Sequence, residues 1–148
     1  MQHRPRAWAL LALSAYALAL AAVLLQPSAG AAITTVGGVS DWLRETLGAP
    51  REVVSNARVE FVLNALMVAP VTFLGSWLLP RLRVVDWWFY AFCAAALVEA
   101  FQGLFLAGRT AEFVDIIGNS LGAALGAWAA VGRRNLTDRS GLPSGAAR

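Results

Sequence analysis

Lysine is absent from this chain of 148 residues, which also has a single cysteine, Cys93, and a single histidine, His3. One cysteine forms neither an internal disulfide nor a metal cluster, and His3 lies alone near the N-terminus. The sequence also contains no P-loop, no HExxH helix and no CxxC pair. It therefore predicts no metal site and no cofactor, and it assigns no catalytic residue.

Charged residues are scarce as well, at 14% of the chain, whereas hydrophobic residues make up 58%. A soluble domain has about 25% charged and about 45–50% apolar residues. The formal net charge of +3 comes entirely from arginine. Because the arginines lie near the ends of apolar runs, they indicate orientation in a membrane and not nucleic-acid binding.

The apolar residues form four runs of the length that crosses a bilayer, about 17–25 residues. These runs cover residues 7–25, 61–79, 84–106 and 113–131. The sequence therefore predicts an all-α membrane protein, a four-transmembrane-helix bundle over residues 7–131. Residues 1–6 are predicted to be a short tail and residues 132–148 a disordered tail. The first run also resembles a signal peptide, although it is longer than the usual apolar core of about 7–15 residues.

The arginines predict which way the bundle faces, since they accumulate on the cytoplasmic side of membrane spans. Seven of them flank the runs at one side of the predicted membrane: Arg4, Arg6, Arg81, Arg83, Arg133, Arg134 and Arg139. On the other side, arginine is mixed with aspartate and glutamate. Both termini are therefore predicted to be cytoplasmic, in a multi-pass protein of the bacterial cytoplasmic membrane, with residues 26–60 as an external loop.

A short helix is predicted within this loop, over residues 40–47. Ser40 or Asp41 is expected to cap its start, and Gly48 is expected to end it before Pro50. Its apolar side chains allow two placements, one on the lipid interface and one in water, and both stay open.

Polar side chains recur inside the last three runs, although a charged group inside lipid costs roughly 2.5–3.5 kcal/mol. They are Asn64, Glu99, Gln102, Asp115 and Asn119, with Arg109 in the link between the last two runs. At a helical rise of about 1.5 Å per residue, Glu99 and Gln102 lie roughly 10 and 6 Å from the outer end of the third run. Asp115 and Asn119 lie roughly 3 and 9 Å from the outer start of the fourth. The sequence therefore predicts a polar intramembrane pocket in the outer leaflet.

Small residues favour close packing of the same helices. Gly118, Gly122 and Gly126 repeat every four residues, which lets membrane helices approach closely. Pro70 and Gly75 are expected to kink the second run or to expose a backbone carbonyl for a partner. The polar residues have a structural interpretation too, as hydrogen bonds between helices, and for Asn64 alone this interpretation is favoured.

One pattern of polar and small residues links the last three runs. It reads Asn64, Pro70, Glu99-x-x-Gln102, Arg109 and Asp115-x-x-x-Asn119-x-x-Gly122-x-x-x-Gly126. Over residues 58–131 this pattern resembles the VanZ-like family of bacterial membrane proteins. The resemblance implies a place in the cell envelope and, from the family's founding type, lowered susceptibility to teicoplanin-like lipoglycopeptide antibiotics.

The leading hypothesis is a non-enzymatic envelope protein whose outward-facing pocket binds a polar or amphiphilic group. The candidate ligands are lipid-linked cell-wall material and the glycopeptide antibiotic, with Arg109 pairing an anionic group. Three alternatives stay open. They are an intramembrane enzyme with Glu99 or Asp115 as general base, a small transporter and a structural scaffold. The lipid bilayer is the one partner that the composition implies, and the oligomeric state is not defined.

Overall fold

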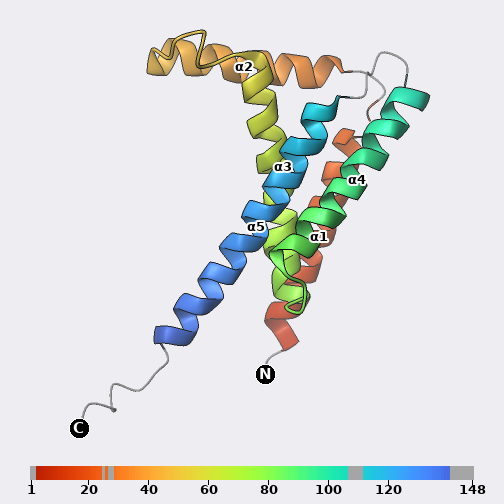
Figure 1. Cartoon of the computed structure of the whole chain (residues 1–148), viewed down its shortest axis with the longest axis vertical. Coiled ribbons are helices and arrows are strands. Elements are labelled where there is room, and N and C mark those ends of the chain that lie inside the picture. Colours follow the sequence, from red (N-terminus) through yellow and green to blue (C-terminus); the bar gives the residue numbers. More distant parts are fainter. Residues whose placement is uncertain (1–2, 25, 27–28, 107–111, 141–148) are drawn as a thin grey trace.

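The computed structural model describes residues 3–24, 26, 29–106 and 112–140, and over these residues it is helical, with no β-strand (Figure 1). The helices are α1 (His3–Leu24), α2 (Gly30–Leu47), α3 (Asn56–Leu78), α4 (Val84–Phe105) and α5 (Phe113–Ser140). Four of them contain a segment long and apolar enough to cross a membrane: Ala7–Leu24, Asn56–Leu78, Val84–Phe105 and Phe113–Arg134. The predicted class, an all-α membrane protein with four spans, is confirmed.

The spans alternate in direction, and α2 runs across one end of the bundle (Figure 1). At this end, which we call the α2 end, α1 and α4 finish while α3 and α5 begin. The opposite end holds the start of α1, the link between α3 and α4, and the far part of α5 (Figure 1). Residues late in α4 and early in α3 and α5 therefore share one end of the molecule.

The helices extend beyond the predicted runs in three places. Residues 3–6 belong to α1 and not to a tail. α3 begins at Asn56, within the predicted external loop, because the Ser55 hydroxyl accepts a hydrogen bond from the Arg58 N–H at 3.4 Å. α5 continues to Ser140, so the prediction of a disordered tail from residue 132 is wrong up to that point. No proline and no glycine occurs in the sequence from 133 to 140 to end the helix earlier.

The helix predicted over residues 40–47 is also longer than expected, since α2 starts at Gly30. Ser40 is not its N-cap. The side chain is buried in the middle of the helix and donates to the Val36 carbonyl at 2.8 Å. The predicted end at Gly48 is confirmed, and this glycine has a φ of 63°. A left-handed conformation of this kind costs other residues roughly 1–2 kcal/mol.

Arg44 forms hydrogen bonds between α2 and the segment that leads into α3. Its Nε and Nη2 atoms donate to the Val54 carbonyl at 3.0 and 2.7 Å, and its Nη1 atom pairs with Asp41 at 3.0 Å. Val36, Val54 and Val59 form a small hydrophobic cluster at the same corner. These contacts position α2 across the end of the bundle.

α3 packs more extensively against α5 than against any other helix. A Cβ atom at Gly122 would overlap the backbone of Ala65, and one at Gly126 would overlap the carbonyl of Ala69. A Cβ atom at Gly118 would lie 3.1 Å from the carbonyl oxygen of Phe61. These three glycines of α5 thus face Phe61, Ala65 and Ala69, which repeat every four residues on α3. At these positions the two backbones meet without intervening side chains. We call this contact the glycine seam.

α1 contacts α3 beside the internal proline. α3 remains helical through Pro70, although proline has no N–H to donate to the carbonyl of Leu66. The next carbonyl, that of Met67, accepts a hydrogen bond from the Tyr16 hydroxyl of α1 at 2.9 Å. A polar contact between two spans therefore forms in the turn that precedes the proline.

Arginine side chains mark the end opposite α2. Asp86 accepts from the Arg83 N–H at 2.8 Å and from its guanidinium at 3.0 and 3.2 Å, which caps the start of α4. These hydrogen bonds and the charge of Asp86 raise the pKa of Arg83 above its ordinary value. The guanidinium of Arg133 lies 5.0 Å from the centre of the Trp77 ring, within the range of a cation–π contact.

Candidate functional site

Asn64 and Asp115 join α3 to α5 near the α2 end. The Asn64 amide donates to the Asp115 carboxylate, with 2.7 Å between Nδ2 and Oδ1. The contact places Asp115 one turn before Gly118, which approaches Phe61 and Asn64 on α3. The glycine seam therefore sets the separation at which this hydrogen bond can form.

Glu99 lies in the last part of α4 and meets the start of α5. Its side chain is buried, with 6% of the residue exposed, and its Oε2 atom accepts from the backbone N–H of Glu112 at 2.8 Å. The first N–H groups of a helix have no partner within the helix, and a negative charge there is favourable. Glu99 thus provides a cap for α5 from a neighbouring helix.

Gln102 caps the end of α1 from the neighbouring helix α4. It is 3% exposed, and its Nε2 atom donates to the carbonyl of Leu24 at 2.8 Å. Leu24 is the last residue of α1, so its carbonyl has no partner within the helix. Glu99 and Gln102 share one face of α4, and each satisfies the end of a different helix. The i,i+3 spacing of the pair therefore has a structural explanation that sequence reasoning did not find.

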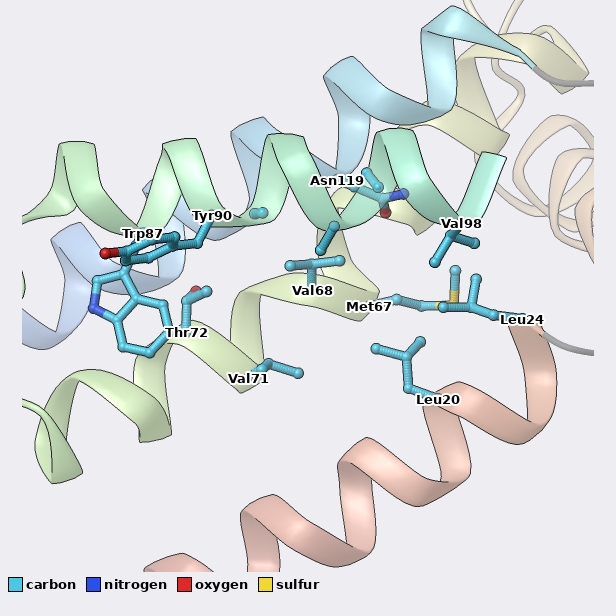
Figure 2. Close-up of a pocket in the computed structure, with 13 residues that line it drawn as sticks. Leu20, Leu24, Met67, Val68, Val71, Thr72, Trp87, Tyr90, Val98 and Asn119 are labelled. Carbon is cyan, nitrogen blue, oxygen red and sulfur yellow. The ribbon is translucent and has the colours of Figure 1, made fainter. Parts of the chain in front are cut away.

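Asn119 lies one turn beyond Asp115 on α5 and borders a cavity (Figure 2). Within the described part of the chain its carboxamide makes no hydrogen bond, whereas Asn64, Glu99, Gln102 and Asp115 each make one. A polar group at membrane depth without a partner costs free energy. Of these five polar side chains, Asn119 is the one that borders the cavity.

The cavity has a volume of about 280 Å³ and lies between α1, α3 and α4, near the lower limit of roughly 300 Å³ for small-molecule pockets. Its lining is apolar apart from a few groups. The lining residues are Leu20, Leu24, Met67, Val68, Val71, Thr72, Trp87, Tyr90, Ala91, Ala94, Ala95, Val98 and Asn119. Figure 2 shows Trp87 and Thr72 at one end, and Val98 and Leu24 at the other. We call it the apolar cavity.

Trp87 closes the end of the apolar cavity farthest from α2. A Cβ atom at Gly75 of α3 would overlap the Trp87 ring, so the glycine makes room for the indole. Sequence reasoning treated Gly75 as a possible kink and did not find this role. Nor did it find the cavity, because an apolar side chain in a span faces either a neighbouring helix or lipid, and the hydropathy pattern is the same in both cases.

The α2 end of this region is acidic. Glu60, Glu99 and Glu112 lie close enough to Asp115 to act on it by charge repulsion. Arg109, the predicted positive member of the pocket, lies outside the described residues. Among the residues that the structure covers, no three His, Cys, Asp or Glu side chains gather closely enough to hold a metal ion.

The fold and the site together define a class. The chain is a multi-pass helical membrane protein with polar side chains from three spans near one end of an apolar cavity. It belongs to the VanZ/LLP1 family, whose sequence profile matches residues 13–134, and the predicted resemblance is thereby confirmed. No curated protein and no solved structure matches the chain.

Proposed function

We propose that this protein lies in the bacterial cytoplasmic membrane with both termini in the cytoplasm, and that it lowers susceptibility to teicoplanin-like lipoglycopeptides by binding an amphiphile at its α2 end. One observation carries the proposal. Asn64, Glu99, Asp115 and Asn119 come from three different spans and gather near one end of an apolar cavity. An amphiphile, such as lipid-linked cell-wall material or the antibiotic itself, has the same division into a polar and an apolar part.

Arg109 is the proposed partner of an anionic group on this ligand, since a guanidinium binds carboxylate and phosphate through paired hydrogen bonds. The acidic surroundings of Asp115 disfavour an anion unless a positive charge is present nearby. The proposal therefore requires that Arg109→Ala abolish protection against teicoplanin-like lipoglycopeptides while the amount of protein in the membrane stays normal.

The test is teicoplanin susceptibility of a sensitive Gram-positive host that expresses the wild type or Glu99→Gln at matched membrane levels. Glutamine keeps an oxygen that accepts from the Glu112 N–H and removes the charge. The matched control is Glu45→Gln, the same change at an exposed position of α2. We expect protection by the wild type and by Glu45→Gln and loss of protection in Glu99→Gln. No protection by well-expressed wild type would refute the resistance role.

The hydrogen bonds favour a second candidate function, a structural scaffold. Asn64, Glu99 and Gln102 each bond to a different helix or helix end. If these contacts serve only the fold, every substitution at them lowers the amount of protein in the membrane before it changes any phenotype. A Glu99→Gln protein that accumulates normally and gives no protection would contradict the scaffold. An intramembrane enzyme would differ again, since Glu99→Gln and Asp115→Asn would then abolish turnover while binding survives.

A further inference from the structure

We propose that the apolar cavity holds one acyl chain of a membrane lipid, with the carbonyl that links the chain to its headgroup hydrogen-bonded to Asn119. The inference rests on the proposed function for its biological meaning and narrows the class of ligand, because it excludes cell-wall material that is linked to a polyisoprenyl chain. Three observations carry it: the lining of the cavity, its access from the bilayer and the unpaired amide on its wall.

The lining of the cavity favours an apolar occupant. Of the thirteen residues that border the cavity, Thr72, Trp87, Tyr90 and Asn119 carry a polar side-chain atom, and the rest are aliphatic. The Thr72 hydroxyl already donates to the Ala69 carbonyl at 3.2 Å. Water in such a cavity would need two to four polar partners. Hydrocarbon suits this mainly aliphatic lining, and within the described residues it leaves two lining groups without a partner, the Asn119 amide and the buried Trp87 Nε1 atom.

The cavity is accessible from the side of the bundle. Tyr90 and Ala94 on α4 border it and are themselves exposed, and the segment that carries them is a candidate membrane span. Exposure at this depth is exposure to lipid. α1 contributes only Leu20 and Leu24, near the α2 end, so it leaves the rest of that side uncovered. A chain of a bilayer lipid can therefore enter sideways.

The polar atom on the wall lies where an acyl linkage would lie. Asn119 faces the cavity near Val68 and Val98 (Figure 2). Its amide makes no hydrogen bond within the described residues, and its Nδ2 atom can donate to an ester or amide carbonyl. Seven residues farther along α5, or roughly 10 Å, Gly126 packs against Thr72, which lies at the Trp87 end. A saturated chain that starts at Asn119 thus has room to run toward the indole.

The Asn119 amide favours an acyl chain over a polyisoprenyl chain, because an acyl chain brings a carbonyl that can accept from it. A polyprenyl phosphate carries no ester or amide group at the start of its hydrocarbon, so it would leave the Asn119 amide unpaired. The headgroup lies toward the α2 end, one turn beyond the cavity, near Asn64 and Glu99. On α3, Asn64 comes three residues before the lining residue Met67, and on α4, Glu99 directly follows the lining residue Val98.

The experiment uses the full chain in nanodiscs that contain phosphatidylethanolamine with a photoactivatable diazirine midway along one acyl chain. Cross-linked residues are quantified at the cavity wall, on Ala91 and Ala95, and at Leu97. Leu97 is 72% exposed on the same helix and does not border the cavity, so it reports ordinary contact with bilayer lipid. The ratio of the two signals is the readout.

Two matched variants decide the result. Ala94→Phe fills the cavity, and Ala100→Phe makes the same change at an exposed position of α4 outside it. We expect the ratio to fall at least about fivefold in Ala94→Phe, equivalent to about 1 kcal/mol of binding free energy, and to stay unchanged in Ala100→Phe. Ala94→Leu replaces Ala94→Phe if the larger residue prevents folding. An equal ratio in all proteins would overturn the proposal.

Asn119→Leu tests the polar contact, because leucine keeps a similar volume and removes the amide. We expect it to lower the ratio for the acyl probe in the same direction as Ala94→Phe. A polyprenyl phosphate probe that labels the cavity more strongly than the acyl probe would overturn the assignment of the chain. Loss of resistance in Glu99→Gln with no cavity labelling would leave the proposed function standing, whereas cavity labelling without any resistance would leave only the present inference standing.

Discussion

The hydrogen bond between Asn64 and Asp115 shows what a single polar contact does between these spans. Both groups lie in candidate membrane spans, where few other polar partners are available. Polar contacts of this kind nevertheless contribute only about 0.6 kcal/mol on average, and at most about 1.7 kcal/mol, because the separated helices also find partners. The contact therefore aligns α3 and α5 and adds little to their total stability.

A double-mutant cycle on Asn64→Ala and Asp115→Ala measures this contact. We expect a coupling free energy of about 1 kcal/mol, with the free energy of unfolding determined by steric trapping in bicelles. The control cycle pairs Asn64→Ala with Thr34→Ala. Thr34 bonds only to Gly30 within α2, so the two changes are expected to be additive. Additivity in the Asn64–Asp115 cycle would show that the bond does not contribute to stability.

At the same scale, the sequence indicates which polar residues matter but not what they contact. The spacing of Glu99 and Gln102 shows that they share a face of α4. Their partners are the N–H of Glu112 and the carbonyl of Leu24, both backbone groups at helix ends. Every residue carries a carbonyl, and every residue except proline an N–H, so no pattern of side chains identifies these partners. Only the placement of α1 and α5 against α4 does.

The helices themselves are more predictable, because length and apolar composition dominate in a membrane. All four predicted runs lie within spans or extend them by a few residues. The start of α2 is the main error. Gly37, Gly38, Thr34 and Thr35 have low helix propensity, and the packing of Val36 against Val54 and Val59 overrides it. Propensity is local, whereas this packing depends on a segment that comes later in the chain.

The glycine seam predicts a sharp contrast between two identical substitutions in α5. Gly122→Ala places a methyl group against the backbone of Ala65, and overpacking of this kind costs about 1–3 kcal/mol. Gly132→Ala meets no atom within 4 Å, and alanine in a helix is favoured over glycine by about 0.5–1 kcal/mol. We expect the first change to lower the free energy of unfolding and the second to leave it unchanged or raise it.

The measurement for this pair is again steric trapping in bicelles. Equal effects of Gly122→Ala and Gly132→Ala would mean that α3 and α5 lie farther apart than the structure shows.

For the whole molecule, the proposed orientation follows from the distribution of arginine. The end opposite α2 carries Arg81, Arg83 and Arg133, and α2 crosses the other end. Cytoplasmic segments next to spans are enriched in arginine, which supports the proposal that α2 lies outside the cell. The chain offers a simple test, because Cys93 is its single cysteine and can be replaced by serine.

In a Cys93→Ser background, we expect Gly38→Cys to react with a membrane-impermeant maleimide in intact cells and Arg81→Cys to react only after permeabilisation. Both positions are exposed, and a Cβ atom at Gly38 meets no other atom within 4 Å. The reverse pattern of labelling would show that the protein faces the other way and would remove the basis for an external binding site.

The glycine seam has a consequence for how the protein is made. α5 follows α3 and α4 in the chain, so α3 enters the membrane before the helix that covers Phe61, Ala65 and Ala69 has been synthesised. During that interval Asn64 lies in the bilayer without Asp115. Since membrane helices insert first and associate afterwards, the tightest contact of the bundle is also among the last to form. Asn64 therefore gains its partner on α5 only when the final span is in place.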